Sequence, residues 1–186
     1  SFSYLCRENK EKLRKDMIRN PFITAGYEGP EYFCDRVDET QRLTKLLLNG
    51  NNVLLMSPRR IGKTGLLHHC FSSDEISSAY NTFIIDIYST KNLDDLVFTM
   101  GRTIISSLKS KGRKAMERFL DIVSSLRQGV TFDYQGNPTW NLEIGSLKTP
   151  TFTLDQIFSY LEESEKPCLV AIDEFQQITY YPEDNV

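Results

Sequence analysis

A short run beginning at Ser57 combines a glycine, a lysine and a hydroxyl side chain at the spacing that binds phosphate groups. It fits the pattern G-x-x-x-x-G-K-S/T with serine in the first place. The candidate nucleotide ligands are Ser57, Pro58, Arg59, Arg60, Ile61, Gly62, Lys63, Thr64 and Gly65. In such a loop, backbone N–H groups and the start of a helix face the phosphates. Gly62 would let the backbone approach, Lys63 would reach the β- and γ-phosphates, and Thr64 would hold Mg²⁺. The alternative is a helix-initiating turn that carries Gly-Lys-Thr by chance.

An acidic pair, Asp173 and Glu174, follows an apolar run about 110 residues after the lysine. Ligands of open α/β sheets lie just beyond the carboxyl ends of the strands. Asp173 is therefore expected to bind Mg²⁺, and Glu174 to polarise an attacking water and act as the catalytic carboxylate together with Lys63. A solvated strand end is the alternative for the pair taken alone. The water-activating glutamate favours hydrolysis over transfer, and the absence of an N-K-x-D element favours ATP over GTP.

The elements that must position these residues alternate between apolar strand-sized runs and amphipathic helical stretches. We expect strands at 52–57, 82–88 and 168–172, and helices at 35–48, 65–71, 92–110, 113–127 and from Thr153 onward. The last of these would start at a capping box formed by Thr153 and Gln156. Strands that alternate with helices predict an α/β fold with a parallel sheet flanked by helices.

Residues 130–144 have a different pattern, in which aromatic and polar residues alternate around a Gly-Asn-Pro turn. This pattern predicts a β-hairpin inserted into the α/β fold. Its aromatic side chains, Phe132, Tyr134 and Trp140, are expected to cover the sheet or the preceding helix, and a partner-binding insertion is the alternative.

The composition excludes several classes of protein. The 186 residues suffice for one domain, and no apolar run approaches the length of a membrane span. The four cysteines lack a C-x-x-C pair and the only histidines are adjacent, so a zinc site is not expected. A net charge of −3 argues against a nucleic-acid-binding surface over the whole protein. Residues 1–20 are predicted to form a charged helix ahead of a core at 21–186, and the lack of a secretory signal predicts a cytoplasmic protein.

Taken together, these motifs resemble the archaeal-type ATPase family, a branch of the AAA+ and STAND P-loop ATPases. The resemblance covers roughly residues 20–180 and implies an AAA+-like P-loop NTPase fold. In that family a segment of the form F-x-x-R-x-x-E helps to frame the adenine pocket, and Phe33, Arg36 and Glu39 match it. An ordinary helix with a surface ion pair is the alternative for these three residues.

The resemblance also implies parts that this sequence does not contain. The chain ends twelve residues after Glu174, without a sensor strand, a helical lid or an arginine finger. We therefore expect the N-terminal part of a longer protein, truncated after the acidic strand, and the alternative is a chain that completes its sheet in another way. A homo-oligomer formed through the full-length protein is a candidate assembly. The expected function is Mg²⁺-dependent ATP binding and hydrolysis coupled to a conformational change or assembly. A slow nucleotide switch that regulates a protein partner and a DNA-associated AAA+ loader are the alternatives.

Overall fold

The computed structural model describes residues 27, 29–30, 33, 36–58, 61–127, 130–140 and 150–182. The charged helix expected at 1–20, the loop residues Arg59 and Arg60, and the end of the expected hairpin at 141–144 lie outside this range. The helices are α2 (Val37–Leu48), α3 (Lys63–Phe71), α4 (Asp74–Ala79), α5 (Leu93–Leu108), η2 (Lys109–Lys111), α6 (Arg113–Ile122), α7 (Ser124–Arg127), α8 (Pro150–Glu162) and η3 (Phe175–Tyr180). The strands are β1 (Asn81–Asp86), β2 (Val130–Phe132), β3 (Pro138–Trp140) and β4 (Cys168–Asp173). No helix in the described part of the chain has both the length and the apolar character to cross a membrane.

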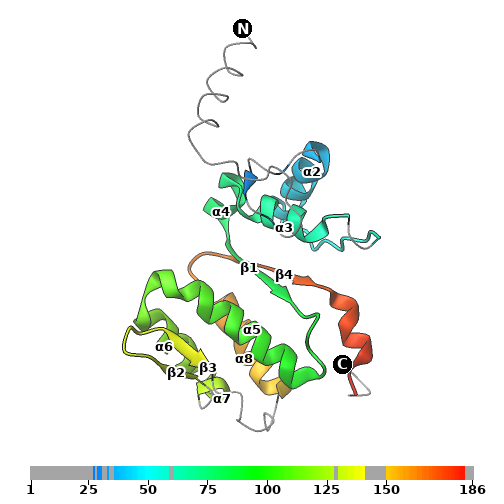
Figure 1. Cartoon of the computed structure of the whole chain (residues 1–186). Coiled ribbons are helices and arrows are strands. Elements are labelled where there is room, and N and C mark those ends of the chain that lie inside the picture. Colours follow the sequence, from blue (N-terminus) through cyan, green and yellow to red (C-terminus); the bar gives the residue numbers. More distant parts are fainter. Residues whose placement is uncertain are drawn as a thin grey trace, which may run out of the picture.

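A parallel pair of strands, β1 and β4, lies at the centre of the fold (Figure 1). The register runs from Asn81 opposite Cys168 to Asp86 opposite Asp173, so the two strands end side by side. This pair confirms the expected α/β class with parallel strands. Helices cover both faces of the pair, with α2, α3 and α4 on one side and α5 and α8 on the other.

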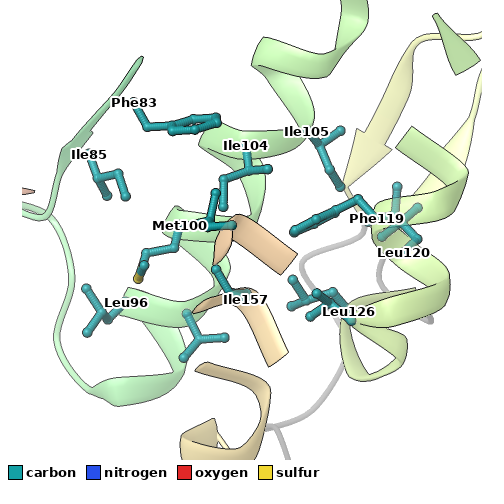
Figure 2. Close-up of a cluster of buried hydrophobic side chains, with 14 of the residues drawn as sticks. Phe83, Ile85, Leu96, Met100, Ile104, Ile105, Phe119, Leu120, Leu126 and Ile157 are labelled. Carbon is teal, nitrogen blue, oxygen red and sulfur yellow. The ribbon is translucent and has the colours of Figure 1, made fainter. Parts of the chain in front are cut away.

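The larger hydrophobic core lies on the α5 side of the sheet, where alternate residues of β1 meet three helices. Phe83 and Ile85 point toward α5, and Phe119 of α6 and Ile157 of α8 close the cluster (Figure 2). Helix α5 forms because its apolar residues recur along one face and because the Asn92 side chain accepts a hydrogen bond from the Asp95 N–H at 2.8 Å. This core joins β1 to helices α5, α6 and α8, which lie below the strand pair in Figure 1.

A smaller core lies on the opposite face and holds the helix that follows the predicted phosphate loop. Leu66 and Cys70 of α3 pack with Leu43 and Leu47 of α2, and Ile84 of β1 lies against this cluster. Since Ile84 lies between Phe83 and Ile85, the two faces of β1 are separated as the two-residue period of a strand requires. The smaller core therefore positions α3 relative to β1 and β4, since Leu169 and Ala171 of β4 also pack against it.

The expected strand at 52–57 is wrong, because residues 51–58 have no regular secondary structure. Side-chain burial does alternate along this segment, and Leu54 and Met56 are 76% and 84% exposed. A strand needs a partner for its backbone groups. Here a cavity of about 730 Å³ separates the segment from β4, and residues of both line it. The alternating apolar pattern is therefore present, but this segment does not form a strand.

Helix α8 begins at Pro150 rather than at the expected capping box. Thr153 lies inside the helix and is completely buried, and the Oε1 atom of Gln156 is buried without a hydrogen-bond partner. Proline is favoured in the first helical turn because its missing N–H would have no partner there. Ile157 and Leu161 are buried in the core, whereas Phe158 is 42% exposed.

Two further expectations are corrected between α5 and α8. The single helix expected at 113–127 divides into α6 and α7 at Val123, whose ψ of 63° is not helical. The hairpin is confirmed over the described residues 130–140, where β2 and β3 pair antiparallel. Phe132 packs against the core, as expected, but Tyr134 is 95% exposed and covers neither the sheet nor a helix. The Trp140 side chain lies outside the described set.

Candidate functional site

The described ends of the predicted phosphate loop fold around a lysine and lead into a helix. Gly62 has φ of 78°, a left-handed conformation that glycine adopts without a steric penalty, and α3 starts at the next residue. The Lys63 ammonium donates hydrogen bonds to the carbonyl oxygens of Ser57 at 3.0 Å and Pro58 at 3.3 Å. Ser57, which replaces the first glycine of the pattern, does not have a positive φ. A serine at this position therefore carries no steric penalty of that kind. Lysine, loop and helix start therefore lie together.

The two candidate metal ligands are in direct contact. The Thr64 hydroxyl, on the first turn of α3, donates a hydrogen bond of 2.5 Å to the Oδ2 atom of Asp173 at the end of β4. The other carboxylate oxygen accepts from the Glu174 N–H at 2.9 Å. Asp173 is 8% exposed, so this carboxylate is held by defined partners rather than by bulk water. Residues 109 positions apart in the sequence are thus brought to one point.

Glu174 follows Asp173 in a backbone conformation that is unusual for a side-chain-bearing residue. Its φ of 57° and ψ of 38° are left-handed, a conformation that is strained for residues other than glycine. Its carboxylate accepts a hydrogen bond from the amide of Gln176, in η3. The residue is partly buried, and the hydrogen bond from Gln176 holds its carboxylate toward η3.

The segment after Glu174 is fastened to the loop that follows β1. Gln177 donates to the Thr90 carbonyl oxygen at 3.0 Å. The buried Thr90 hydroxyl donates to the Ile87 carbonyl oxygen at 2.6 Å, so the Tyr181 hydroxyl, 2.5 Å away, must donate to Thr90. These bonds fix η3 relative to the ends of both strands. Asp86, at the end of β1, accepts a hydrogen bond from the Tyr88 N–H at 2.9 Å and closes a turn.

Arg36 contacts the loop rather than standing apart from it. The residue precedes α2 with φ of 64° and ψ of 30°, and its carbonyl oxygen accepts hydrogen bonds from the N–H of Thr40 at 3.0 Å and from its hydroxyl at 2.9 Å. Its guanidinium donates a hydrogen bond to the Ile61 carbonyl oxygen. Glu39, the third residue of the predicted adenine-framing segment, lines with Arg36 a cavity of about 460 Å³ that the loop also borders.

Phe33 packs against α3 and belongs to an aromatic cluster that the sequence did not predict. Its ring stacks on His69 with centroids 4.1 Å apart, and a Cβ added at Gly65 would lie 3.8 Å from the ring. The Tyr27 hydroxyl lies 3.1 Å from Nδ1 of His69, and its ring stacks on His68 at 6.0 Å. The adjacent histidines on a predicted helix were the available signal. The structure places Phe33 against the first turn of α3, whereas the Arg36 guanidinium contacts the loop before that helix.

Cys70, on the buried side of α3, belongs to the framework of the site. Its Sγ lies 3.2 Å from the Thr44 hydroxyl. Burial raises the pKa of the Cys70 thiol, while the Thr44 hydrogen bond lowers it and the nearby Glu75 carboxylate raises it further. A buried thiol with a raised pKa is a poor nucleophile, so Cys70 contributes packing rather than chemistry.

The donor set suits a hard cation more than a soft one. Within the described ranges, no three side chains of histidine, cysteine, aspartate or glutamate gather in a way that could hold a metal ion. The hydroxyl and carboxylate of Thr64 and Asp173 are oxygen donors of the kind that Mg²⁺ takes when substrate phosphates and water complete its coordination. The Ser57 hydroxyl in the same loop is buried and has no hydrogen-bond partner among the described residues. These features fit a site for a magnesium-bound phosphate.

Comparison of the chain with models of known protein families, with curated proteins and with solved structures finds no match.

Proposed function

We propose that this protein binds Mg²⁺-ATP and hydrolyses it at the junction of the 57–64 loop, α3 and the end of β4. The observation that carries the proposal is the hydrogen bond of 2.5 Å between Thr64 and Asp173. A hydroxyl at a helix start and a carboxylate at the end of a parallel strand meet where an open α/β sheet binds ligands. An AAA+-like P-loop NTPase fold, with the acidic strand paired to a parallel neighbour, is part of this proposal.

Phosphate binding falls to the loop and the first turn of α3. The unpaired N–H groups at the start of this nine-residue helix and the positive end of its dipole favour an anion. Lys63, now bonded to two loop carbonyl oxygens, lies where it can exchange those neutral acceptors for charged phosphate oxygens. The unpartnered Ser57 hydroxyl offers one further hydrogen bond at the same place.

Thr64 and Asp173 would hold Mg²⁺, which, when bound, neutralises charge on the β- and γ-phosphates. Their present mutual hydrogen bond keeps both oxygens at one point. Glu174 would accept a proton from the attacking water, because it directly follows the metal-binding carboxylate and lies at the same strand end. Breaking its bond to Gln176 would free the carboxylate for that role.

The same contact favours one alternative function, a slow nucleotide switch. The Gln176 amide holds one of the two carboxylate oxygens of Glu174 and so restricts the direction in which this carboxylate can approach a water. A protein that keeps this contact when ATP binds would hold the nucleotide with little turnover and report the bound state to a protein partner. The two functions differ in turnover rather than in binding.

The testing experiment measures thermal unfolding and phosphate release for the parent chain, Lys63→Ala, Glu174→Gln and a control, Lys109→Ala. Lys109 is exposed and is the first residue of η2, which follows α5 in the sequence. Mg²⁺-ATP at about 100 times its dissociation constant adds roughly 2.7 kcal/mol of stability, or about 5–10 °C for a chain of this size. We expect that shift in the parent, the control and Glu174→Gln, and its loss in Lys63→Ala. Turnover that falls in Glu174→Gln supports hydrolysis, whereas negligible turnover in the parent supports the switch. A parent chain that ATP does not stabilise would refute both.

A further inference from the structure

We infer that Arg36 is a positioning residue for the phosphate-binding loop, because its guanidinium holds the Ile61 carbonyl oxygen and thereby turns the Gly62 N–H into the loop. The inference rests on the proposed function. It assigns Arg36 to the phosphates, whereas the motif resemblance assigned it to the adenine pocket.

The peptide bond between Ile61 and Gly62 links the Arg36 contact to the direction of the Gly62 N–H. A trans peptide is planar, so its C=O and its N–H point in opposite directions. No cis peptide occurs among the described residues. Because Arg36 binds the Ile61 oxygen, the Gly62 N–H points away from the guanidinium. In the proposed site this N–H is one of the loop donors that face the phosphates.

The next peptide is fixed as well, which leaves the loop little freedom at this point. The Gly62 carbonyl oxygen accepts the Leu66 N–H at 3.0 Å and so belongs to the first turn of α3. Gly62 itself has the left-handed φ of 78° that joins the two peptide planes. Arg36 on one side and α3 on the other therefore determine where the Gly62 N–H points.

The conformation of Arg36 indicates that its place is enforced by its surroundings. It has φ of 64°, and Glu174 is the only other described non-glycine residue with a positive φ. Strained residues of this kind persist where the neighbouring structure holds them, and they cluster at functional sites. The two Thr40 hydrogen bonds to the Arg36 carbonyl oxygen provide that hold on the helix side. The Arg36 side chain lines the cavity of about 460 Å³ together with residues of the loop.

The alternative role, contact with the adenine base, predicts a different response to the ligand. A residue that orders the loop affects every ligand carrying the same phosphates, including inorganic tripolyphosphate. A residue that touches the base affects ATP alone. Tripolyphosphate and ATP, both with Mg²⁺, therefore separate the two roles.

The experiment measures the dissociation constants of Mg²⁺-ATP and Mg²⁺-tripolyphosphate by calorimetry for the parent, Arg36→Ala, Arg36→Gly and Arg36→Lys. Arg36→Gly keeps the left-handed backbone without strain and guards against a folding defect in Arg36→Ala. Lys45→Ala is the matched control, because Lys45 is an exposed cation on α2 and does not line this cavity. We expect both ligands to weaken by the same factor, about 10- to 100-fold, the range for loss of a charge-assisted hydrogen bond.

Rescue distinguishes positioning from general support of the fold. Guanidinium ion at low millimolar concentration should restore part of the binding of both ligands to Arg36→Gly, and Arg36→Lys should bind between the parent and Arg36→Gly. Weakening of ATP alone, or unchanged binding of both ligands in Arg36→Gly, would overturn the inference. A parent chain that binds neither ligand would instead refute the proposed function, and this inference with it.

Discussion

The hydrogen bond between Thr64 and Asp173 provides a quantitative test of the site in the absence of any ligand. Thr64→Val removes the hydroxyl but keeps the shape of the side chain, and Asp173→Ala removes the acceptor. Because the acceptor is a buried carboxylate at 8% exposure, the bond is charge-assisted and is worth about 1.5–3 kcal/mol. We therefore expect Thr64→Val to lower the free energy of unfolding by about that amount, or roughly 3–12 °C in Tm.

The assay is a double-mutant cycle followed by urea unfolding in buffer containing EDTA. Each single variant already removes the bond, so the double variant should be more stable than the sum of the two losses predicts. The difference is the coupling energy, expected at about 1.5–3 kcal/mol. Thr64→Val combined with Asp133→Asn, in the distant hairpin, is the control pair and should be additive. Additivity of the Thr64 and Asp173 variants within about 0.5 kcal/mol would refute the geometry on which the proposed magnesium site depends.

Three further predictions concern the framework of the fold. Phe119→Ala, at a completely buried position, should destabilise the protein by about 3–5 kcal/mol in chemical unfolding, and a loss under about 1 kcal/mol would contradict the packing of the larger core. Tyr181→Phe should cost about 1 kcal/mol in the same assay, because its hydroxyl donates to Thr90; an unchanged midpoint would argue against that bond. Hydrogen bonds from the Asn137 backbone and side chain and from neighbouring backbone N–H groups lower the pKa of Asp133 below its ordinary value of 3.8. Because the pKa of Asp133 is lower in the folded state, the ionised carboxylate stabilises the fold at pH values above 3.8. The hairpin should lose this stabilisation as the pH falls through the lowered pKa. An NMR titration midpoint of Asp133 at or above 3.8 would contradict the prediction.

Local patterns were enough to predict much of the fold. The helix from Leu93 to Leu108 was expected at 92–110 because its apolar residues repeat at helical spacing and acidic residues occupy its first turn. The parallel strands β1 and β4 followed from short apolar runs separated by helices, and the hairpin from strict alternation around a turn. A six-residue helix, Asp74–Ala79, was missed although Ser73 caps it, because such a short run carries too little periodicity.

The remaining differences arise where structure depends on distant residues. The apolar run at 52–57 suits a strand, but pairing requires a neighbour, and β4 lies across a cavity. The sequence placed Thr64 and Asp173 at one site through motif spacing, and the structure brings them into contact. It could not foresee that Arg36 reaches Ile61, because that contact joins residues 25 positions apart in the sequence. The adjacent histidines were a signal, but no motif linked His69 to Phe33, whose ring stacks on it.

Arg36 and Glu174 both have a left-handed backbone conformation that costs stability, and both carry a side chain that the proposed activity needs. A non-glycine residue in this region costs about 1–2 kcal/mol, whereas glycine costs about 0.5–1 kcal/mol through its greater freedom in the unfolded chain. Glycine at either position should therefore leave the free energy of unfolding nearly unchanged or slightly raised. A directed-evolution campaign that selects for heat resistance alone would accept both substitutions and discard the guanidinium and the carboxylate. Thermostabilised variants of this protein should for that reason also be screened for the proposed nucleotide turnover.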